Sequence, residues 1–294
     1  MILGIDVGGT HTDSVLMQNR KIIRKSKVLT DKNDILGCVM RATQAVATPD
    51  DIKQLHRIVL STTISTNAVA QNQLDPVGLI VMNGPGVSPK DLPLADKTSL
   101  IAGYMNHRGI EAEALDDDEL AALKQKFSKD KIDNLAVIGK FSTRNPVHEQ
   151  EVGAYFDGQA SHVSLGHHQS GVLNFPRRIA TTYLNSAIWR LHSRMVDQLA
   201  SYLQGLGVDV PLFILKADGG TIGVEQSRKY PVQTILSGPA ATIMGVLPFV
   251  SSTADSVSID VGGTTTDIAL FADGAPLLDC LLYTSPSPRD QRGS

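Results

Sequence analysis

Apolar and polar residues near the start of the chain follow patterns that predict three consecutive β-strands. Residues 2–5 are an apolar run typical of a buried strand, and a Gly-Gly pair follows soon after. Residues 12–17 read as the strand that returns from this turn, and residues 22–28 read as a third strand. The chain is therefore expected to begin with an antiparallel hairpin, with Asp6 at the end of its first strand.

Farther along the chain, helical spacing of apolar residues alternates with short apolar runs. Residues 83–109 form an irregular stretch that is rich in turn residues. Helices are predicted over 34–46, from a cap at 61–63 through 70, and over 116–127, 146–156, 176–206 and 237–246. Strands are predicted over 56–60, 77–82, 135–138 and 212–215. This order predicts an α/β fold with a mixed sheet.

The first hairpin has a second copy near the other end of the chain. Residues 5–17 read IDVGGTHTDSVLM and residues 259–271 read IDVGGTTTDIALF, with nine of the thirteen positions identical. Two copies, 254 residues apart, exclude a solenoid and indicate two related subdomains that each begin with the same hairpin. Each Gly-Gly turn is expected to take positive φ and to let the backbone approach a ligand closely.

Composition narrows the class of protein. The 294 residues are 42% hydrophobic and 19% charged, with a net charge of −3, which is ordinary for a soluble globular protein and gives no reason to expect nucleic acid or a membrane as partner. No apolar run is long enough for a transmembrane helix. Cys38 and Cys280 belong to no C-x-x-C pair, so no disulfide framework or zinc site is expected, and a cytoplasmic location fits.

The repeated motif supplies the two kinds of group that a magnesium-bound phosphate chain requires. Backbone N–H groups of a glycine-rich turn neutralise phosphate oxygens, and carboxylates hold Mg²⁺, usually through its water shell. Asp6 and Asp260 are the expected metal residues, and Asp13 and Asp267 complete the expected catalytic carboxylates. The residues expected to bind the phosphates are Gly8, Gly9, Thr10 and Thr12 in one copy and Gly262, Gly263, Thr264 and Thr265 in the other.

A single Asp-x-Gly-Gly-Thr turn is more often a structural hairpin than a binding site. Two copies that also keep the Thr-x-Thr-Asp tail favour phosphate binding, because a structural turn does not require that tail. Further polar residues are candidates for substrate binding, although helix capping and surface salt bridges explain them equally simply. These candidates are Thr62, Thr63, Asn67, Arg144, Arg178 and Asn185.

The paired hairpins resemble the two phosphate-binding motifs of the actin-like ATPase superfamily, which includes sugar kinases, Hsp70 and actin. The sequence between them is similar to the hydantoinase A/oxoprolinase family, with its motifs in the same order. These motifs are LSTTISTNAV (60–69), GKFSTRNPVHEQEVG (139–153), NFPRRIATTYLNSAI (174–188), KADGGT (216–221) and SGPAA (237–241).

This resemblance implies a fold of two ribonuclease-H-like subdomains with mixed sheets. It implies a subunit that uses ATP and Mg²⁺ to phosphorylate the carbonyl of a cyclic amide or imide for ring opening. The alternatives are an ATP-dependent ketone carboxylase subunit and a small-molecule kinase of the same superfamily. A B-type hydantoinase subunit is the implied partner, and a homo-oligomer is also compatible with the sequence.

The resemblance also implies a division of the chain. Residues 1–172 correspond to the N-terminal domain with the first hairpin, and residues 173–280 to the start of the core domain with the second. The adenosine-binding Gly-Gly motif expected after residue 271 is missing. We therefore expect an incomplete second subdomain, a C-terminally truncated chain that is inactive alone, and a disordered or non-native tail over residues 281–294, which are rich in Pro, Ser and Arg.

Overall fold

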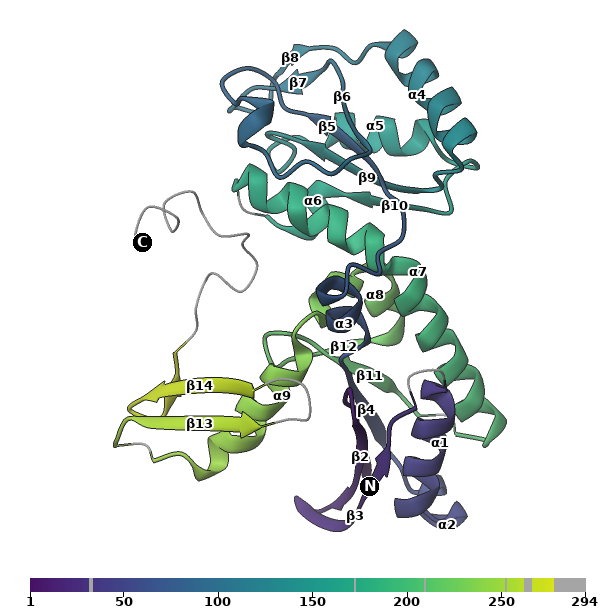
Figure 1. The fold of residues 1–294 in the computed structure, drawn as a ribbon, viewed down its shortest axis with the longest axis vertical. Coiled ribbons are helices and arrows are strands. Elements are labelled where there is room, and N and C mark those ends of the chain that lie inside the picture. The colour runs from purple at the N-terminus through teal and green to yellow at the C-terminus, as the bar shows by residue number, and fades with distance from the viewer. Residues whose placement is uncertain (32–33, 172, 209, 252, 262–265, 278–294) are drawn as a thin grey trace. The chain divides into compact units, whose positions relative to one another are not determined.

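The computed structural model describes residues 1–31, 34–171, 173–208, 210–251, 253–261 and 266–277, whose contacts form two compact units (Figure 1). Met1–Asn72 and Leu191–Asp279 form the first unit, and Gln73–Arg190 form the second. The predicted tail and residues Gly262 to Thr265 lie outside the described residues. The predicted domains, 1–172 and 173–280, are defined by resemblance to family motifs rather than by contacts, and they stay predictions.

A six-stranded sheet forms the centre of the first unit, in the order β12-β11-β4-β1-β2-β3. Strands β1, β2 and β3 pair antiparallel, whereas β4 and β11 are parallel to β1. This mixed sheet has the arrangement expected of a ribonuclease-H-like subdomain, and the predicted mixed α/β fold is confirmed. The strands are β1 (Ile2–Val7), β2 (His11–Gln18), β3 (Lys21–Leu29), β4 (Arg57–Thr62), β11 (Leu212–Leu215) and β12 (Thr221–Gly223).

Alternation along β1 gives the sheet two different faces. Leu3, Ile5 and Val7 are buried in a core with α1 (Ile35–Val46) and the later part of α7 (Phe175–Gly205), both on the same side of the sheet (Figure 1). The residues between them, including Asp6, point to the opposite face, as the period of two in a strand requires. The same alternation that builds the core therefore places the carboxylate away from it.

Short helices complete the first unit. Helix α3 is bonded to the segment that enters α9, because the Leu236 N–H donates to Thr66 Oγ1 over 2.8 Å. The start of α9 is bonded to the end of β4, because Ser237 Oγ donates to the Thr62 carbonyl over 3.2 Å. These bonds fix two helix starts beside the ends of β1 and β4. The elements are α2 (Pro49–Lys53), α3 (Ile64–Ala70), α8 (Val224–Lys229), α9 (Ser237–Val246) and the 3₁₀ turns η2 (Pro231–Thr234) and η3 (Leu247–Phe249).

The second copy of the motif forms a hairpin like the first. Strands β13 (Ser256–Val261) and β14 (Thr266–Ala272) pair antiparallel, and the short β15 (Ala275–Pro276) pairs with β14. Asp260 lies opposite Asp267 on the partner strand, as Asp6 lies opposite Asp13 in the first hairpin. The sequence repeat is therefore a structural repeat with the same register.

One face of the second hairpin is apolar and exposed. Its aliphatic side chains are between 49% and 74% exposed and pair across the two strands. They are Val257, Ile259, Val261, Ile268 and Leu270. A contiguous apolar patch of this kind favours association between molecules.

We expect Ile268→Lys to reduce self-association of the 294-residue chain, because it places a charge in the middle of this patch. Light scattering measured against protein concentration tests this expectation. Leu29→Lys is the matched control, since Leu29 is 74% exposed and belongs to a different sheet. Equal scattering from both variants would show that the patch does not drive association.

The second unit is built on a parallel four-stranded sheet, in the order β10-β9-β5-β6. The central strands β5 and β9 are buried along their whole lengths, as expected for a parallel sheet. Its elements are β5 (Gly78–Met82), η1 (Pro89–Asp91), β6 (Thr98–Leu100), β7 (Tyr104–Met105), β8 (Glu111–Glu113), α4 (Asp117–Asp130), β9 (Asn134–Gly139), α5 (Val147–Tyr155), β10 (His162–Leu165), α6 (Gly166–Gln169) and the first part of α7.

Three local expectations differ from the structure. Gly8 and Gly9 do not take positive φ; instead, a Cβ on Gly8 would lie 2.9 Å from the His11 carbonyl oxygen, so close approach explains this glycine. Ser61 and Thr62 end β4, and Thr63 is the N-cap residue of α3 as predicted, but its side chain makes no capping bond; the Ile64 N–H donates to Thr62 Oγ1 instead. The stretch predicted as irregular contains β6 and β7, which are too short for a periodic signal.

No helix in the described part of the chain combines the length and apolarity needed to cross a bilayer.

Candidate functional site

The two hairpins contribute to one open cleft in the first unit. The cleft has a volume of about 650 Å³ and is also lined by the starts of α3 and α9. Its volume lies within the range of small-molecule sites. The lining residues are Asp6, Gly8, Gly9, Thr10, His11, Asp13, Lys27, Thr63, Thr66, Asn67, Leu236, Gly238, Pro239, Thr242, Asp260, Val261 and Asp267.

Asp6 is the most buried of the four carboxylates in the cleft. Burial raises its pKa, and the nearby charges of Asp13 and Asp260 raise it further. The neighbouring Ser61 hydroxyl lowers this pKa, although the two groups do not meet hydrogen-bond geometry, and Lys27 also lowers it. Asp6 Oδ1 is buried and has no hydrogen-bond partner among the described residues. This end of β1 therefore holds an acceptor atom that a cation or a bound water would satisfy.

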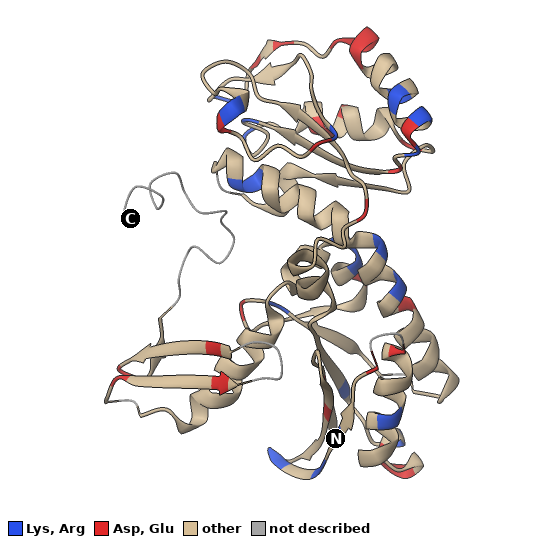
Figure 2. Ribbon diagram, viewed as in Figure 1, with Lys and Arg blue, Asp and Glu red and all other residues tan. Residues whose placement is uncertain are grey.

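The carboxylates of the second hairpin are less buried than Asp6. Burial and the neighbouring Asp260 raise the pKa of Asp267. Thr242 in α9 donates a hydrogen bond from Oγ1 to Asp260 Oδ2 over 2.7 Å, which orients that carboxylate. Acidic residues lie on both strands of this hairpin, as Figure 2 shows. Four carboxylates around one cleft create a strongly negative site that attracts a cation.

Lys27 lines the cleft and brings a positively charged ammonium group to it. It lies opposite Asp13 in the β2–β3 pairing, and Nζ is 3.5 Å from Asp13 Oδ2. Its side chain is 61% exposed, so this surface ion pair is weak and leaves the ammonium available to an incoming anion. Pairing across β2 and β3, rather than sequence proximity, brings Lys27 to the motif.

The first turn presents backbone donors to the cleft. The Gly8 N–H donates to the His11 carbonyl over 3.0 Å and closes the turn. The N–H groups of Gly9 and Thr10 have no acceptor within the described chain. A turn with two free N–H groups fits phosphate oxygens.

The carboxylates fit a metal that keeps its water shell. Among the described residues, no three His, Cys, Asp or Glu side chains converge on one point as direct metal ligands. Mg²⁺ commonly uses one or two carboxylates and several waters, which matches the unpartnered Asp6 oxygen and the exposed Asp260. Asp6 and Asp260 are thus suited to hold a hydrated Mg²⁺ ion.

The other predicted residues of the first unit divide between the cleft and the opposite face of the sheet. Thr12 is fully buried on the α1 side of the sheet, where its hydroxyl bonds to the Thr30 hydroxyl over 2.9 Å. Thr62 faces the same side, whereas Thr63 and Asn67 line the cleft and bond to each other over 3.2 Å. Gly262, Gly263, Thr264 and Thr265 are outside the described residues.

The remaining three candidates belong to the second unit. Arg144 is exposed, whereas Arg178 and Asn185 are buried. The Arg178 guanidinium donates to the carbonyls of Gly139 and Lys140 over 2.9 and 2.7 Å. Asn185 Nδ2 donates to the Ser164 hydroxyl over 3.0 Å. These contacts stabilise the unit, and a role in substrate binding stays a prediction.

Several cleft residues were not identified from the sequence as site residues. Lys27, Thr66, Gly238 and Thr242 are brought to the motif by strand pairing or by the packing of α9. Lys27 had a usable signal, because a hairpin register places it opposite Asp13, and Gly238 lies in the SGPAA motif. The others depend on contacts between segments far apart in the chain.

The raised pKa of Asp6 has a consequence for stability. A carboxyl whose folded-state pKa lies above its ordinary value of 3.8 costs stability once it ionises in the folded protein. Asp6→Asn is therefore expected to be more stable than the wild type at neutral pH without metal. The difference should shrink as pH falls through the folded-state pKa and disappear below 3.8.

Thermal unfolding in EDTA at several pH values measures this difference. Asp273→Asn is the control, because Asp273 is exposed and does not line the cleft. An Asp6→Asn variant that is less stable than wild type at neutral pH would contradict the expectation.

Comparison with known families identifies the family of the chain. The model of the hydantoinase/oxoprolinase N-terminal region matches residues 2–157, and the hydantoinase/oxoprolinase model matches residues 178–281. The chain therefore belongs to the hydantoinase/oxoprolinase family.

Individual relatives are more distant. The chain is 25% identical to caprolactamase subunit alpha of Pseudomonas jessenii, over 92% of this chain and 43% of the relative. It is 22% identical to the acetone carboxylase beta subunit of Xanthobacter autotrophicus, over 93% of this chain and 43% of that subunit. The chain thus spans less than half the length of these curated relatives.

A solved structure shares the fold. The nucleotide-free structure of acetone carboxylase matches with a TM-score of 0.81 at 21% identity, over 93% of this chain and 44% of that chain. At this identity the match supports the fold, and the choice of reaction depends on the site.

Proposed function

We propose that this chain is the phosphate-binding part of an ATP-dependent subunit that activates the carbonyl of a cyclic amide or imide for ring opening. The observation that carries the proposal is the cleft in which two repeated hairpins present four carboxylates beside backbone N–H groups that have no acceptor among the described residues. A phosphate chain accompanied by Mg²⁺ satisfies both kinds of group. Caprolactamase subunit alpha, whose name indicates action on a cyclic amide, supports the substrate class.

The charges of the cleft explain why nucleotide and metal would bind together. A bare triphosphate would be repelled by the carboxylates, whereas a bound Mg²⁺ ion supplies the positive charge that neutralises both groups. The N–H groups of Gly9 and Thr10 would hold phosphate oxygens, and Asp6 and Asp260 would fix the hydrated ion. Thr242 would keep Asp260 oriented. The work of these residues is positioning and charge neutralisation.

ATP-dependent carboxylation of a ketone is the second candidate function. The relatives named acetone carboxylase beta subunit and acetophenone carboxylase gamma subunit support it. In both candidate reactions a phosphoryl group would be transferred to a carbonyl oxygen of the substrate, so the same phosphate site would serve either. The names of the relatives describe them as subunits, which supports a second subunit as partner. We propose a B-type hydantoinase subunit for the cyclic-amide reaction.

Calorimetry on the 294-residue chain tests the phosphate site. We expect inorganic triphosphate and ATP to bind with similar, weak affinity, and only when Mg²⁺ is present. GTP should bind like ATP, because the cleft residues described here offer phosphate contacts rather than contacts to a base. Binding that is unaffected by removal of Mg²⁺, or no binding at all, would refute the proposed phosphate site.

Lys27→Gln is expected to weaken binding of Mg²⁺-triphosphate about tenfold, because it removes a charge-assisted contact to the anion. Lys27→Arg should retain most of the affinity. Lys25→Gln is the matched control, since Lys25 is exposed on the same strand but does not line the cleft. Equal affinities for Lys27→Gln and Lys25→Gln would remove Lys27 from the site.

A further inference from the structure

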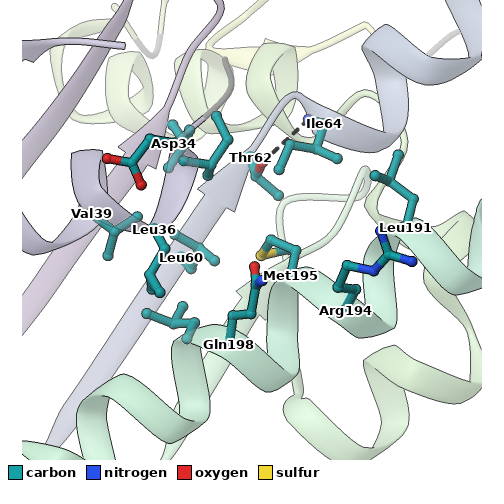
Figure 3. Close-up of a pocket in the computed structure, with 13 residues that line it drawn as sticks. Asp34, Leu36, Val39, Leu60, Thr62, Ile64, Leu191, Arg194, Met195 and Gln198 are labelled. Atoms are coloured by element: carbon teal, nitrogen blue, oxygen red, sulfur yellow. Dashed lines mark hydrogen bonds between the residues drawn. The ribbon is translucent and has the colours of Figure 1, made fainter. Parts of the chain in front are cut away.

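A second pocket of about 410 Å³ lies in the first unit, between α1, α7 and the ends of β1 and β4 (Figure 3). Its floor consists of the buried aliphatic residues Val7, Val39, Leu60 and Leu199. Leu36, Ile64 and Met195 form its partly exposed walls. An apolar pocket of this volume is of the size that binds small molecules.

This pocket is separate from the carboxylate cleft. Val7 and Thr62 are register partners on neighbouring strands and line the pocket. Asp6 and Ser61, the preceding pair in the register, belong to the opposite face of the sheet. The two sites therefore lie back to back on the same strand ends.

The polar groups of the pocket differ in whether they are already engaged. The Asp34 carboxylate accepts a hydrogen bond from the Gly37 N–H over 2.9 Å and lies 3.5 Å from Arg41 Nη1. Thr62 Oγ1 accepts from the Ile64 N–H over 3.2 Å. The Asp34 carboxylate and the Thr62 hydroxyl are therefore already engaged in contacts within the protein.

Arg194 is different. It lies across the pocket from Asp34 in Figure 3, and it has no hydrogen bond or ion pair with any residue in the described part of the chain. Gln198 follows one helical turn later on the same wall and adds an amide donor. The available polar groups thus form a cationic edge beside an apolar floor.

We propose that this pocket binds a small aliphatic carboxylate, with its hydrocarbon chain on the floor and its carboxylate at Arg194 and Gln198. A guanidinium matches a carboxylate in both charge and planar geometry. An aliphatic amine fits less well, because its positive charge would lie beside the Arg194 guanidinium and because the Asp34 carboxylate already has partners. The inference concerns the opposite face of the sheet from the proposed phosphate site and does not depend on ATP binding.

Hexanoate, butanoate and hexylamine are suitable probes for the 294-residue chain. Binding is measured by calorimetry, and its location by the methyl NMR signal of Met195, assigned with Met195→Leu. We expect hexanoate to shift this signal and to bind roughly tenfold more tightly than butanoate, because two additional methylene groups are buried. Hexylamine should neither bind nor shift the signal.

Two variants test the polar and apolar parts separately. Arg194→Gln should weaken hexanoate binding about tenfold. This exposed residue can be replaced without disturbing the core, whereas Leu36→Trp should fill the pocket and abolish the response. Arg108→Gln, an exposed arginine in the second unit, should bind hexanoate like the wild type.

The proposal is overturned if hexanoate leaves the Met195 signal unchanged, or if hexylamine shifts it equally. Unchanged affinity in Arg194→Gln would also overturn it. Should Leu36→Trp fail to fold, the comparison of Arg194→Gln with Arg108→Gln still decides the outcome.

Discussion

Asp6→Asn and Asp260→Asn are each expected to weaken Mg²⁺-dependent triphosphate binding by about 10²-fold, the scale of losing one preorganised electrostatic contact. Asp6 offers a buried oxygen that has no partner among the described residues, and Asp260 is held in place by Thr242. Calorimetry with and without Mg²⁺ measures the loss. A parallel fall in ATP turnover is expected in any active form of the protein that contains this region.

Thr242→Val refines the first expectation, because it removes the hydrogen bond to Asp260 and leaves the carboxylate itself. We expect a smaller loss of affinity for this variant than for Asp260→Asn. Asp273→Asn, outside the cleft, should bind like the wild type. Wild-type affinity in both Asp6→Asn and Asp260→Asn would exclude a metal site shared by the two hairpins.

Arg178→Met is expected to lower the free energy of unfolding of the second unit by about 3–5 kcal/mol, the cost of removing one member of a buried charge network. The guanidinium is 1% exposed, and it donates to the carbonyls of Gly139 and Lys140. The nearby Glu149 carboxylate, itself fully buried, favours the charged form of Arg178, although burial lowers the Arg178 pKa. The substitution would leave these acceptors without their cation.

Urea unfolding followed by tryptophan fluorescence measures this effect. Trp189 is the single tryptophan of the sequence, and it lies in the second unit, stacked on His162. Arg178→Lys should be intermediate, because it keeps the charge and loses the planar guanidinium, whose Nη1 also donates to Ser142 Oγ over 3.4 Å. Arg177→Met is the neighbouring control, and a loss as large as that of Arg178→Met would argue against a specific role for the buried guanidinium.

The repeat made the hairpins predictable. Alternation along β1 and β2 and the Gly-Gly turn are local features, and the identical residues of both copies fix the same register in each. Asp6 opposite Asp13 and Asp260 opposite Asp267 follow directly from that register. Long helices such as α7 were also predictable, because helical spacing is a signal repeated over many turns.

The substrate candidates show where local patterns stopped being informative. Thr62 and Thr63 are adjacent and alike in the sequence, yet they line different pockets because Thr62 is the last residue of a strand and Thr63 precedes a helix. Arg178 resembles a binding residue in the sequence, whereas tertiary packing buries it against backbone carbonyls. Burial depends on segments distant in the chain, which no local pattern encodes.

The sequence by itself therefore determined the two hairpins, their acidic chemistry and the alternation that turns Asp6 away from the core. Only the tertiary structure decided which other groups join them. Lys27 reaches the cleft through β-pairing, and Thr242 reaches Asp260 through the packing of α9. The physical reason is that strand period and turn chemistry act over a few residues, whereas a site is completed by contacts that close long loops of chain.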